Sequence, residues 1–272
     1  MQSENRRLLV LMLPAGVFFA AFFLLPMGRL FFIGGSGTLG WAAYPAIVTD
    51  RLYFGSLLST LAVATATTLV TLVISGIAGV FLQRHRFPGN AVLVAMLTLP
   101  LAFPGVVIGF MVIMLAGRQG LIGTVTEAIS GERLVFAYSM AGLFMGYVYF
   151  SIPRTILTVM AATEKLDPKL EEAARSLGAS PWQVVRDVIL PGLKPAFISS
   201  GAICFATAVG AFGTAFTLAT RINVLPMVIY TEFTLSANIA MAAALSFVLG
   251  AITWVVLALA RSAAGSTVAA AG

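Results

Sequence analysis

Residues 166–183 read LDPKLEEAARSLGASPWQ, and the stretch continues to the run VILP at residues 188–191. This polar segment lies in a chain whose residues are 60% hydrophobic and only 10% charged. Its capping residues predict two short helices joined by a glycine turn. An organised polar module between apolar segments indicates a surface on which another molecule docks.

The ends of both short helices are marked by residues that satisfy free backbone groups. Asp167 is a good N-cap, and Pro168 suits the first helical position because its missing N–H is not needed there. Gly178 is the expected C-terminal residue with positive φ. Ser180 with Gln183 three residues later predicts a capping box. The two capped helices therefore form a rigid bracket.

The second short helix is expected to end at Pro191, before the next apolar segment. Glu171 and Glu172 in the early turns and Arg175 near the end suit the dipole of the first helix. The residues expected on its apolar side are Leu166, Leu170, Ala173, Ala174 and Leu177.

The composition places the chain in a membrane. Soluble domains carry about 25% charged residues, so this chain has too little charge to cover a globule. Runs of about 18 or more apolar residues are typical of transmembrane helices. The sequence therefore predicts an all-α, polytopic membrane protein with six transmembrane helices. The expected spans are residues 8–32, 55–82, 91–116, 134–156, 196–219 and 239–260.

The distribution of Lys and Arg predicts the orientation, because inner loops carry an excess of both. With the N-terminus inside, eleven of the 16 Lys and Arg fall on the cytoplasmic side. These are Arg6, Arg7, Arg84, Arg86, Arg154, Lys165, Lys169, Arg175, Arg186, Lys194 and Arg261. The five outer ones are Arg29, Arg51, Arg118, Arg133 and Arg221. Both termini and the bracket are thus expected in the cytoplasm. The charge lies beside the spans, which disfavours nucleic-acid binding despite a net charge of +6.

No residue pattern predicts catalysis or a metal site. His85 is the only histidine, so no metal-binding cluster is expected. Cys204 is the only cysteine and is expected to pack inside a span. A phosphate-binding loop needs glycines and a lysine before Ser or Thr, and no lysine here has that setting. The first apolar run is too long for a signal peptide core.

The bracket resembles the cytoplasmic loop of ATP-binding-cassette (ABC) importer permeases of the type I group. Their signature is Glu-Ala-Ala, three residues, Gly, nine residues, Ile, one residue, Leu-Pro. Only the isoleucine differs, and valine keeps its branched apolar character. The matching positions are Glu172, Ala173, Ala174, Gly178, Val188, Leu190 and Pro191. Residues 98–105 and 243–246 look similar to the polyamine, ferric-iron and aminophosphonate permeases of this group, which is a weaker likeness.

The resemblance implies a fold, a mechanism and partners. The fold is the type I (MetI-like) permease fold, with one domain over residues 1–272 and a coupling-helix loop at 157–195. In this family the loop docks on a cytoplasmic ATPase dimer, which binds ATP and magnesium. A second permease, more often a related chain than a second copy, completes the pathway. An extracytoplasmic solute-binding protein delivers the solute to the bacterial inner membrane.

Kinks, small residues and polar tips at membrane depth mark candidates for the solute pathway. The candidates are Pro100, Pro104, Gly105, Tyr147, Tyr149, Gly210, Gly213 and Glu232. Proline and glycine permit bending and close backbone approach, but they serve helix packing equally well. Glu232 would attract a cationic solute or lie as an ordinary solvated charge.

The expected function is the permease subunit of an ATP-driven importer, without enzymatic activity of its own. Its substrate is expected to be a small polar or charged organic solute, such as a polyamine or an aminophosphonate. An ion-coupled secondary transporter would need ionisable residues near the span centres, and the expected spans have none there. A membrane scaffold without transport would leave the bracket unexplained.

Overall fold

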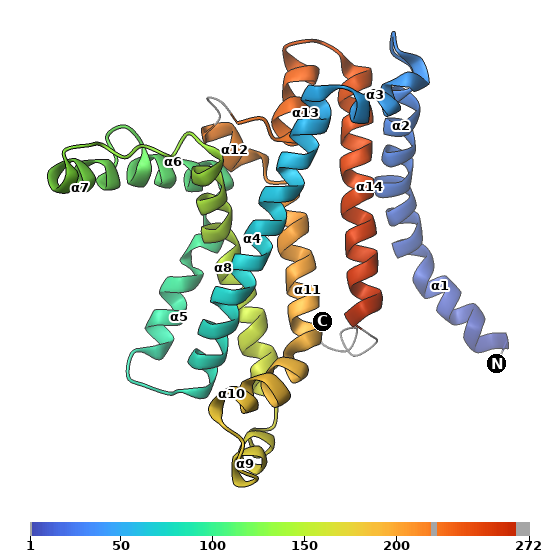
Figure 1. Cartoon of the computed structure of the whole chain (residues 1–272). Helices are drawn as coiled ribbons and strands as arrows, with labels where there is room; N and C mark the ends of the chain where they lie inside the picture. The colour runs from blue at the N-terminus through green and yellow to red at the C-terminus, as the bar shows by residue number, and fades with distance from the viewer. Residues whose placement is uncertain (1, 219–221, 265–272) are drawn as a thin grey trace. The chain divides into compact units, whose positions relative to one another are not determined.

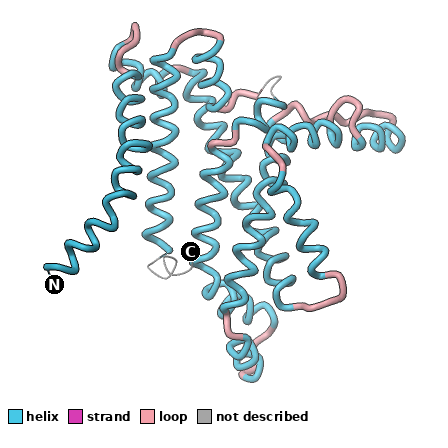
Figure 2. The backbone as a smooth tube through the Cα atoms, turned by 180° about the vertical axis from the view of Figure 1, so that it is seen from behind, coloured by secondary structure: helices cyan, strands magenta, loops and turns pink. Residues whose placement is uncertain are grey.

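A computed structural model describes residues 2–218 and 222–264, with side chains from residue 11 onward. These residues form helices, turns and loops, and no strand is found among them. Figures 1 and 2 show the helices from opposite sides. The helices are α1 (Gln2–Phe19), α2 (Leu25–Gly34), α3 (Ala43–Thr49), α4 (Arg51–Arg84), α5 (Asn90–Thr98), α6 (Gly105–Ala116), α7 (Leu121–Ser130), α8 (Met140–Lys165), α9 (Pro168–Ser176), α10 (Pro181–Val184), α11 (Leu190–Val209), α12 (Phe212–Leu218), α13 (Leu225–Thr234) and α14 (Ile239–Ala264). Two π-helical turns, η1 (Ala20–Leu24) and η4 (Val185–Ile189), and two 3-10 turns, η2 (Gly40–Ala42) and η3 (Leu99–Ala102), link some of them.

Six helical segments of the described chain are long and apolar enough to cross a membrane, which confirms the predicted number. They are Leu11–Gly34, Arg51–Arg84, Gly105–Ser130, Met140–Lys165, Pro181–Val209 and Ile239–Ala264. The predicted bounds differ most for the third, fourth and fifth spans. The side chains of Arg6 and Arg7, and Arg221 with the end of the fifth predicted span, lie outside the described part of the chain.

The chain divides into two compact units, residues 1–57 with 228–251 and residues 58–227 with 252–272. The first unit is held by aromatic packing. Phe31 lies 5.1 Å from Phe247 and 5.4 Å from Tyr44 between ring centroids. The Tyr44 hydroxyl donates to the Phe31 carbonyl at 2.8 Å. These contacts join α2, α3 and α14 within that unit.

In the second unit, the predicted third span is broken at Phe103–Pro104. Residue 103 is extended (φ −97, ψ 134), as expected before a proline, whose ring excludes the helical conformation of its predecessor. α5 and η3 end there, and α6 starts at Gly105 in a different direction (Figure 1). The expectation of one continuous helix over 91–116 is therefore wrong.

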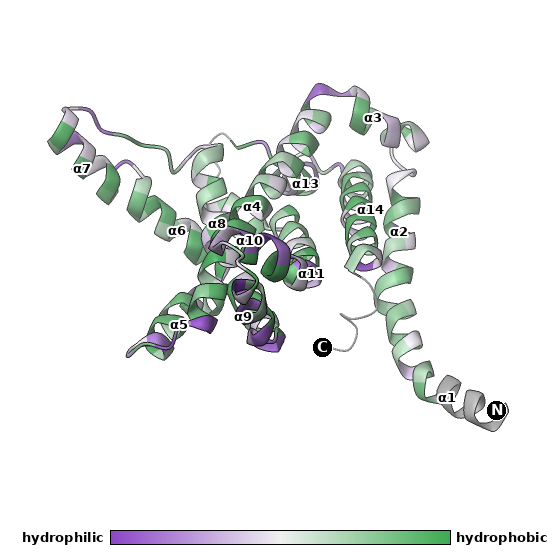
Figure 3. Ribbon diagram, turned by 60° about the horizontal axis from the view of Figure 1, so that its bottom comes forward, coloured by the Kyte–Doolittle hydropathy of each residue, from purple (hydrophilic) through white to green (hydrophobic). Residues whose placement is uncertain are grey.

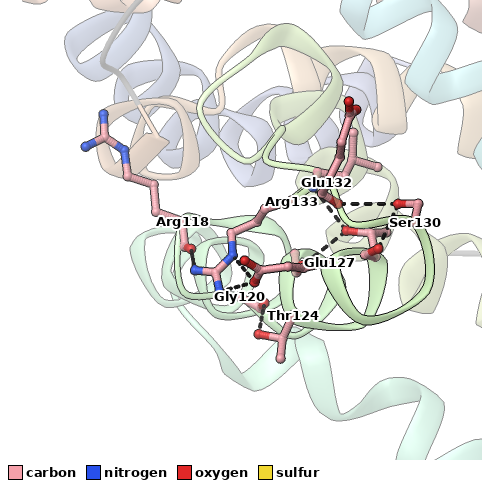
Figure 4. Close-up of polar contacts among 10 residues, drawn as sticks. Arg118, Gly120, Thr124, Glu127, Ser130, Glu132 and Arg133 are labelled. Atoms are coloured by element: carbon pink, nitrogen blue, oxygen red, sulfur yellow. Dashed lines mark hydrogen bonds and ion pairs between the residues drawn. The ribbon is translucent and has the colours of Figure 1, made fainter.

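A polar turn closes the segment that follows α6. The Arg133 side chain donates to Glu127 and, at 3.0 Å, to the Arg118 carbonyl (Figure 4). The Leu134 N–H donates to Thr126 Oγ1 at 3.0 Å. These contacts connect the end of α7 to the loops on both sides of it. Glu127 and Arg133 form the ion pair of this turn.

The fourth span extends farther than expected at its C-terminal end, and the fifth at its N-terminal end. α8 begins after Ser139, whose hydroxyl accepts from the Gly142 N–H, and continues through Pro153 to Lys165. The helical segment Pro181–Val209 is continuous through Pro191, so the expected helix end at Pro191 is wrong. A proline in a helix removes one backbone hydrogen bond. Here the π-helical turn η4, in which the Leu190 N–H bonds to the Val185 carbonyl, accommodates it.

Candidate functional site

The predicted caps of the bracket are confirmed. The Lys169 N–H donates to the Asp167 carboxylate at 3.0 Å. The Ser180 N–H donates to Gln183 at 2.7 Å, and the Gln183 N–H donates back to the Ser180 hydroxyl. Gly178 has φ +85, a left-handed conformation that costs other residues about 1 kcal/mol. α9 and α10 are therefore joined in one defined geometry.

The inner side of the bracket rests on an apolar cluster in the second unit. Val159 from α8, Val184 from α10 and Leu193 from α11 are all buried there, together with Ile189. Leu166, Ala174 and Ala179 pack against this cluster. The bracket is thus fixed to the C-terminal part of α8 and the N-terminal part of α11.

An ion pair fixes the bracket to a third spanning helix. Arg84, the last residue of α4, places its guanidinium 2.6 Å from the Glu171 carboxylate on α9. The two side chains are only 18% and 12% exposed. Arg84 also donates to the Leu166 carbonyl at 3.0 Å, directly before α9. Arg175 lies farther away, 4.0 Å from Glu171. The first glutamate of the pair Glu171-Glu172 thus holds the bracket to α4.

The outer side of the bracket is apolar and uncovered within the described chain. Leu170 is 53% exposed and Leu177 is 89% exposed, with exposed Ala173 between them. Glu172 is exposed beside this stripe, and Trp182 on α10 is 67% exposed. Figure 3 shows hydrophilic and hydrophobic stretches together at α9, while the long helices are mostly hydrophobic. The expected apolar side of α9 therefore faces outward, apart from Leu166 and Ala174.

The remaining signature residues lie where the bracket becomes the fifth span. Val188 is half-buried in η4, and Leu190 and Pro191 are exposed at the start of α11. Val188 thus lies within the π-helical turn, and Leu190 and Pro191 follow it directly. The signature therefore covers both the exposed stripe on α9 and the turn that connects the bracket to α11.

Several pathway candidates lie in one close contact between α6 and α12. The Thr214 hydroxyl donates to the Gly105 carbonyl at 2.9 Å. A Cβ on Gly213 would lie 3.1 Å from the Val106 nitrogen, and one on Gly109 would lie 2.6 Å from the Thr217 Cβ. These glycines permit close helix packing, and their role in a pathway stays a prediction.

The other pathway candidates are not brought together. Tyr147 is buried, and its hydroxyl donates to the Ala211 carbonyl at 2.6 Å, whereas Tyr149 is 41% exposed. Gly210 ends α11 and is exposed. Glu232, in the other unit, accepts a hydrogen bond from the Tyr53 hydroxyl at 3.0 Å. In addition, Pro100 is buried in η3, four residues before Pro104 and on the other side of the break.

The charged residue Arg154 lies deep inside α8. Its charge was counted on the cytoplasmic side, near the end of the predicted span 134–156, but α8 continues for 11 residues beyond it to Lys165. Its guanidinium is exposed and donates to the Thr207 hydroxyl on α11 at 3.2 Å. The expectation that no ionisable residue lies near a span centre is therefore wrong. The signal was the uninterrupted helical stretch after Pro153, without glycine or a cap before Asp167.

No group of three or more His, Cys, Asp or Glu is placed to hold a metal within the described part of the chain. His85 stacks on Phe81, with 4.6 Å between ring centroids, and its Nδ1 lies 3.1 Å from the Phe81 carbonyl. These contacts give His85 a local structural role at the end of α4.

Residues 72–265 match the family described as the inner membrane component of binding-protein-dependent transport systems. The chain belongs to this family. The matched range contains the whole bracket and Arg154. The protein is accordingly an ABC importer permease subunit and a multi-pass inner membrane protein, as the resemblance of the bracket implied.

Relatives in the family are named for different substrates. The sulfate transport system permease protein CysT of Escherichia coli (strain K12) is 31% identical, over 76% of this chain and 73% of its own. The molybdenum transport system permease protein ModB of the same strain is 34% identical, over 68% and 81%. A putative 2-aminoethylphosphonate transport system permease protein, PhnU of Salmonella typhimurium, is 28% identical, over 96% and 94%.

Solved structures show the same fold. A chain in the crystal structure of a bacterial alginate ABC transporter, in complex with an alginate pentasaccharide-bound periplasmic protein, matches with a TM-score of 0.77 and 17% identity. The match covers 96% of this chain and 94% of that one. A chain of the MetNI methionine ABC transporter matches with a TM-score of 0.60 and 19% identity, over 78% and 94%.

We expect Glu171→Ala to destabilise the protein by about 3 kcal/mol, because it leaves the Arg84 guanidinium buried without its counter-charge. The measurement is the melting temperature in detergent. The double variant Arg84→Glu, Glu171→Arg should recover much of the loss. Glu172→Ala is the matched control, since this neighbouring carboxylate is exposed and its loss should change stability by less than about 0.5 kcal/mol. Equal effects of the two alanine variants would contradict a structural role for the ion pair.

Proposed function

We propose that this permease forms half of the solute pathway of an ATP-driven importer and receives force through the bracket at residues 166–191. The other half of the pathway is a second permease, more often a related chain than a second copy. A separate ATPase dimer binds the bracket from the cytoplasm, and an extracytoplasmic solute-binding protein delivers the solute.

The observation that carries this proposal is the uncovered stripe on a firmly anchored helix. Leu170, Ala173 and Leu177 present apolar surface outward on α9. An amphipathic helix in a groove is a common mode of recognition, with anchors at i, i+3 and i+7. Glu172 beside the stripe offers a charge to a basic partner. Because α9 is tied to α4, α8 and α11, a displacement of α9 reaches all three spanning helices.

The energy source is proposed to lie in the partner. This chain has three lysines, Lys165, Lys169 and Lys194, and none follows the glycines of a phosphate-binding loop. ATP and magnesium are accordingly assigned to the ATPase subunit. The permease supplies the docking stripe and the moving helices, and no cofactor is assigned to it.

For the substrate, an aminophosphonate or a related small oxyanion is preferred to a polyamine. Relatives are named for sulfate and 2-aminoethylphosphonate, and both solutes carry a tetrahedral oxyanion. Arg154, inside α8, adds a positive charge to the spanning region. A polycation would be repelled there.

The proposed orientation places both termini and the bracket in the cytoplasm. Placing Arg154 within α8 leaves ten of the 16 Lys and Arg on that side. The ends of α4 and α8 and the whole of α9 lie together at one end of the second unit (Figure 1). The excess of basic residues at that end supports the cytoplasmic assignment.

In proteoliposomes that contain the assembled importer, we expect ATP-driven uptake of 2-aminoethylphosphonate or sulfate, but not of putrescine. Glu172→Lys and Gly178→Pro should abolish uptake, because the first reverses the charge beside the stripe and the second cannot adopt φ +85. Glu132→Lys, in an exposed loop, is the charge control. Normal uptake by both bracket variants would refute the coupling role.

The orientation is tested with single cysteines in a Cys204→Ala background. A membrane-impermeant maleimide should label Lys169→Cys in inverted vesicles but not in intact spheroplasts. Glu132→Cys should show the opposite pattern, because its loop is placed on the outer side. Labelling of Lys169→Cys from outside would overturn the orientation.

A further inference from the structure

Arg154 lies deep within a spanning helix. α8 has 26 residues, and Arg154 is the fifteenth. At 1.5 Å rise per residue it is about 21 Å from the start of the helix and about 16 Å from its end. The hydrocarbon core is about 30 Å thick, so the residue falls near its middle when α8 is centred in it.

A guanidinium at that depth needs a counter-charge or water. Arginine stays charged in proteins. Four ion pairs are found in the described chain, and none includes Arg154. Its one hydrogen bond within the described residues is to the uncharged Thr207 hydroxyl. Intramembrane charges face bundle interiors or water-filled cavities and mark substrate pathways. Contact between the exposed guanidinium of Arg154 and lipid chains is therefore energetically unfavourable.

The surroundings of Arg154 offer hydroxyl groups. A small recess between α8 and α11, with a volume of about 10 Å³ and so room for about one water, is lined by Phe150, Ser151, Arg154, Thr155, Cys204 and Thr207. A larger anion would therefore lie on the exposed side of the Arg154 guanidinium. The Ser151 hydroxyl has no hydrogen-bond partner within the described chain, although the residue is only 5% exposed. The Thr155 and Thr207 hydroxyls donate to carbonyls on their own helices. No carboxylate lines this recess.

We propose that the exposed guanidinium of Arg154, held by Thr207 and flanked by the Ser151 hydroxyl, forms a binding site for a small tetrahedral oxyanion on the translocation pathway. The proposal rests on the proposed function, since it takes the cargo to be such an anion. A guanidinium binds oxyanions through paired N–H donors at fixed spacing, and one N–H of Arg154 is engaged by Thr207. The Ser151 hydroxyl adds a further donor. The single positive charge binds the anion. Because no enclosing set of donors surrounds the anion, it can be released.

The only cysteine of the chain reports on this recess, because Cys204 lines it. The test uses the assembled importer, with the cysteines of the other subunits replaced. Cys204 is treated with an anionic sulfonatoethyl or a cationic trimethylammonioethyl methanethiosulfonate, in nucleotide-free and ATP-trapped states. In the native chain the anionic reagent should react faster, and sulfate should slow it.

Arg154→Gln should lower the ratio of the anionic to the cationic rate by about tenfold or more, because the nearby charge no longer attracts the sulfonate. Arg154→Lys should keep a ratio above that of the glutamine variant. Arg86→Gln removes the same charge from the exposed loop after α4 and should leave the ratio unchanged. A merely structural role of Arg154 would not alter this charge preference.

An unchanged ratio in Arg154→Gln would overturn the site, as would a Cys204 that reacts with neither reagent in any nucleotide state. The first result is also expected if a carboxylate of the second permease neutralises Arg154. Uptake of radiolabelled sulfate and 2-aminoethylphosphonate is measured in parallel, and Arg154→Gln should reduce it by about tenfold. Charge-selective labelling without uptake of either solute would support the anion site and refute only the proposed cargo.

Discussion

The position of the bracket on α4 depends on the ion pair between Arg84 and Glu171. This pair joins the last residue of the long helix α4 to the first turns of the short helix α9, across 87 positions of the sequence. Both side chains are mostly buried, so removal of either partner would leave an uncompensated charge. The second contact of Arg84, to the Leu166 carbonyl, fixes the point where the chain leaves α8. Together these contacts attach the bracket to the membrane helices α4 and α8.

The same helix pair connects the bracket to the proposed anion site. α8 and α11 rest on the bracket through Val159 and Leu193 at their inner ends. Farther along the same helices, Arg154 and Thr207 meet. A movement of α9 that shifts α8 against α11 would therefore change the spacing of the groups in the recess. In the proposed importer, this arrangement would connect ATPase closure to anion binding and release.

Local features of the sequence were sufficient to predict the bracket. The caps at Asp167 and Ser180 and the turn at Gly178 depend on residues within a few positions, so their chemistry is visible in the sequence. The number of spans could also be predicted from the sequence, because it depends on long apolar runs. The proline signals were harder to interpret. Pro104 breaks a helix, whereas Pro191 lies within one, because a π-helical turn before Pro191 accommodates the missing N–H.

Contacts between segments far apart in the chain could not be predicted from the sequence. The signature includes Glu172, but the buried carboxylate is that of its neighbour Glu171. The reason is that α9 orients Glu171 toward α4. Arg154 was counted on the cytoplasmic side because it lies near the end of the predicted span 134–156. The pairing of α8 with α11 places it beside Thr207, and no local pattern specifies that pairing.

The buried ion pair between Arg84 and Glu171 predicts that the bracket and α4 move as one body. Spin labels at His85→Cys and Lys169→Cys, in a Cys204→Ala background of the assembled importer, allow the distance between them to be measured by pulsed electron paramagnetic resonance. If the bracket and α4 move together, the distance distribution will be narrow and the same in the nucleotide-free and ATP-trapped states. It will be broad when Glu171→Ala is added. A distance that shifts between the two nucleotide states in the chain that retains Glu171 would contradict this prediction.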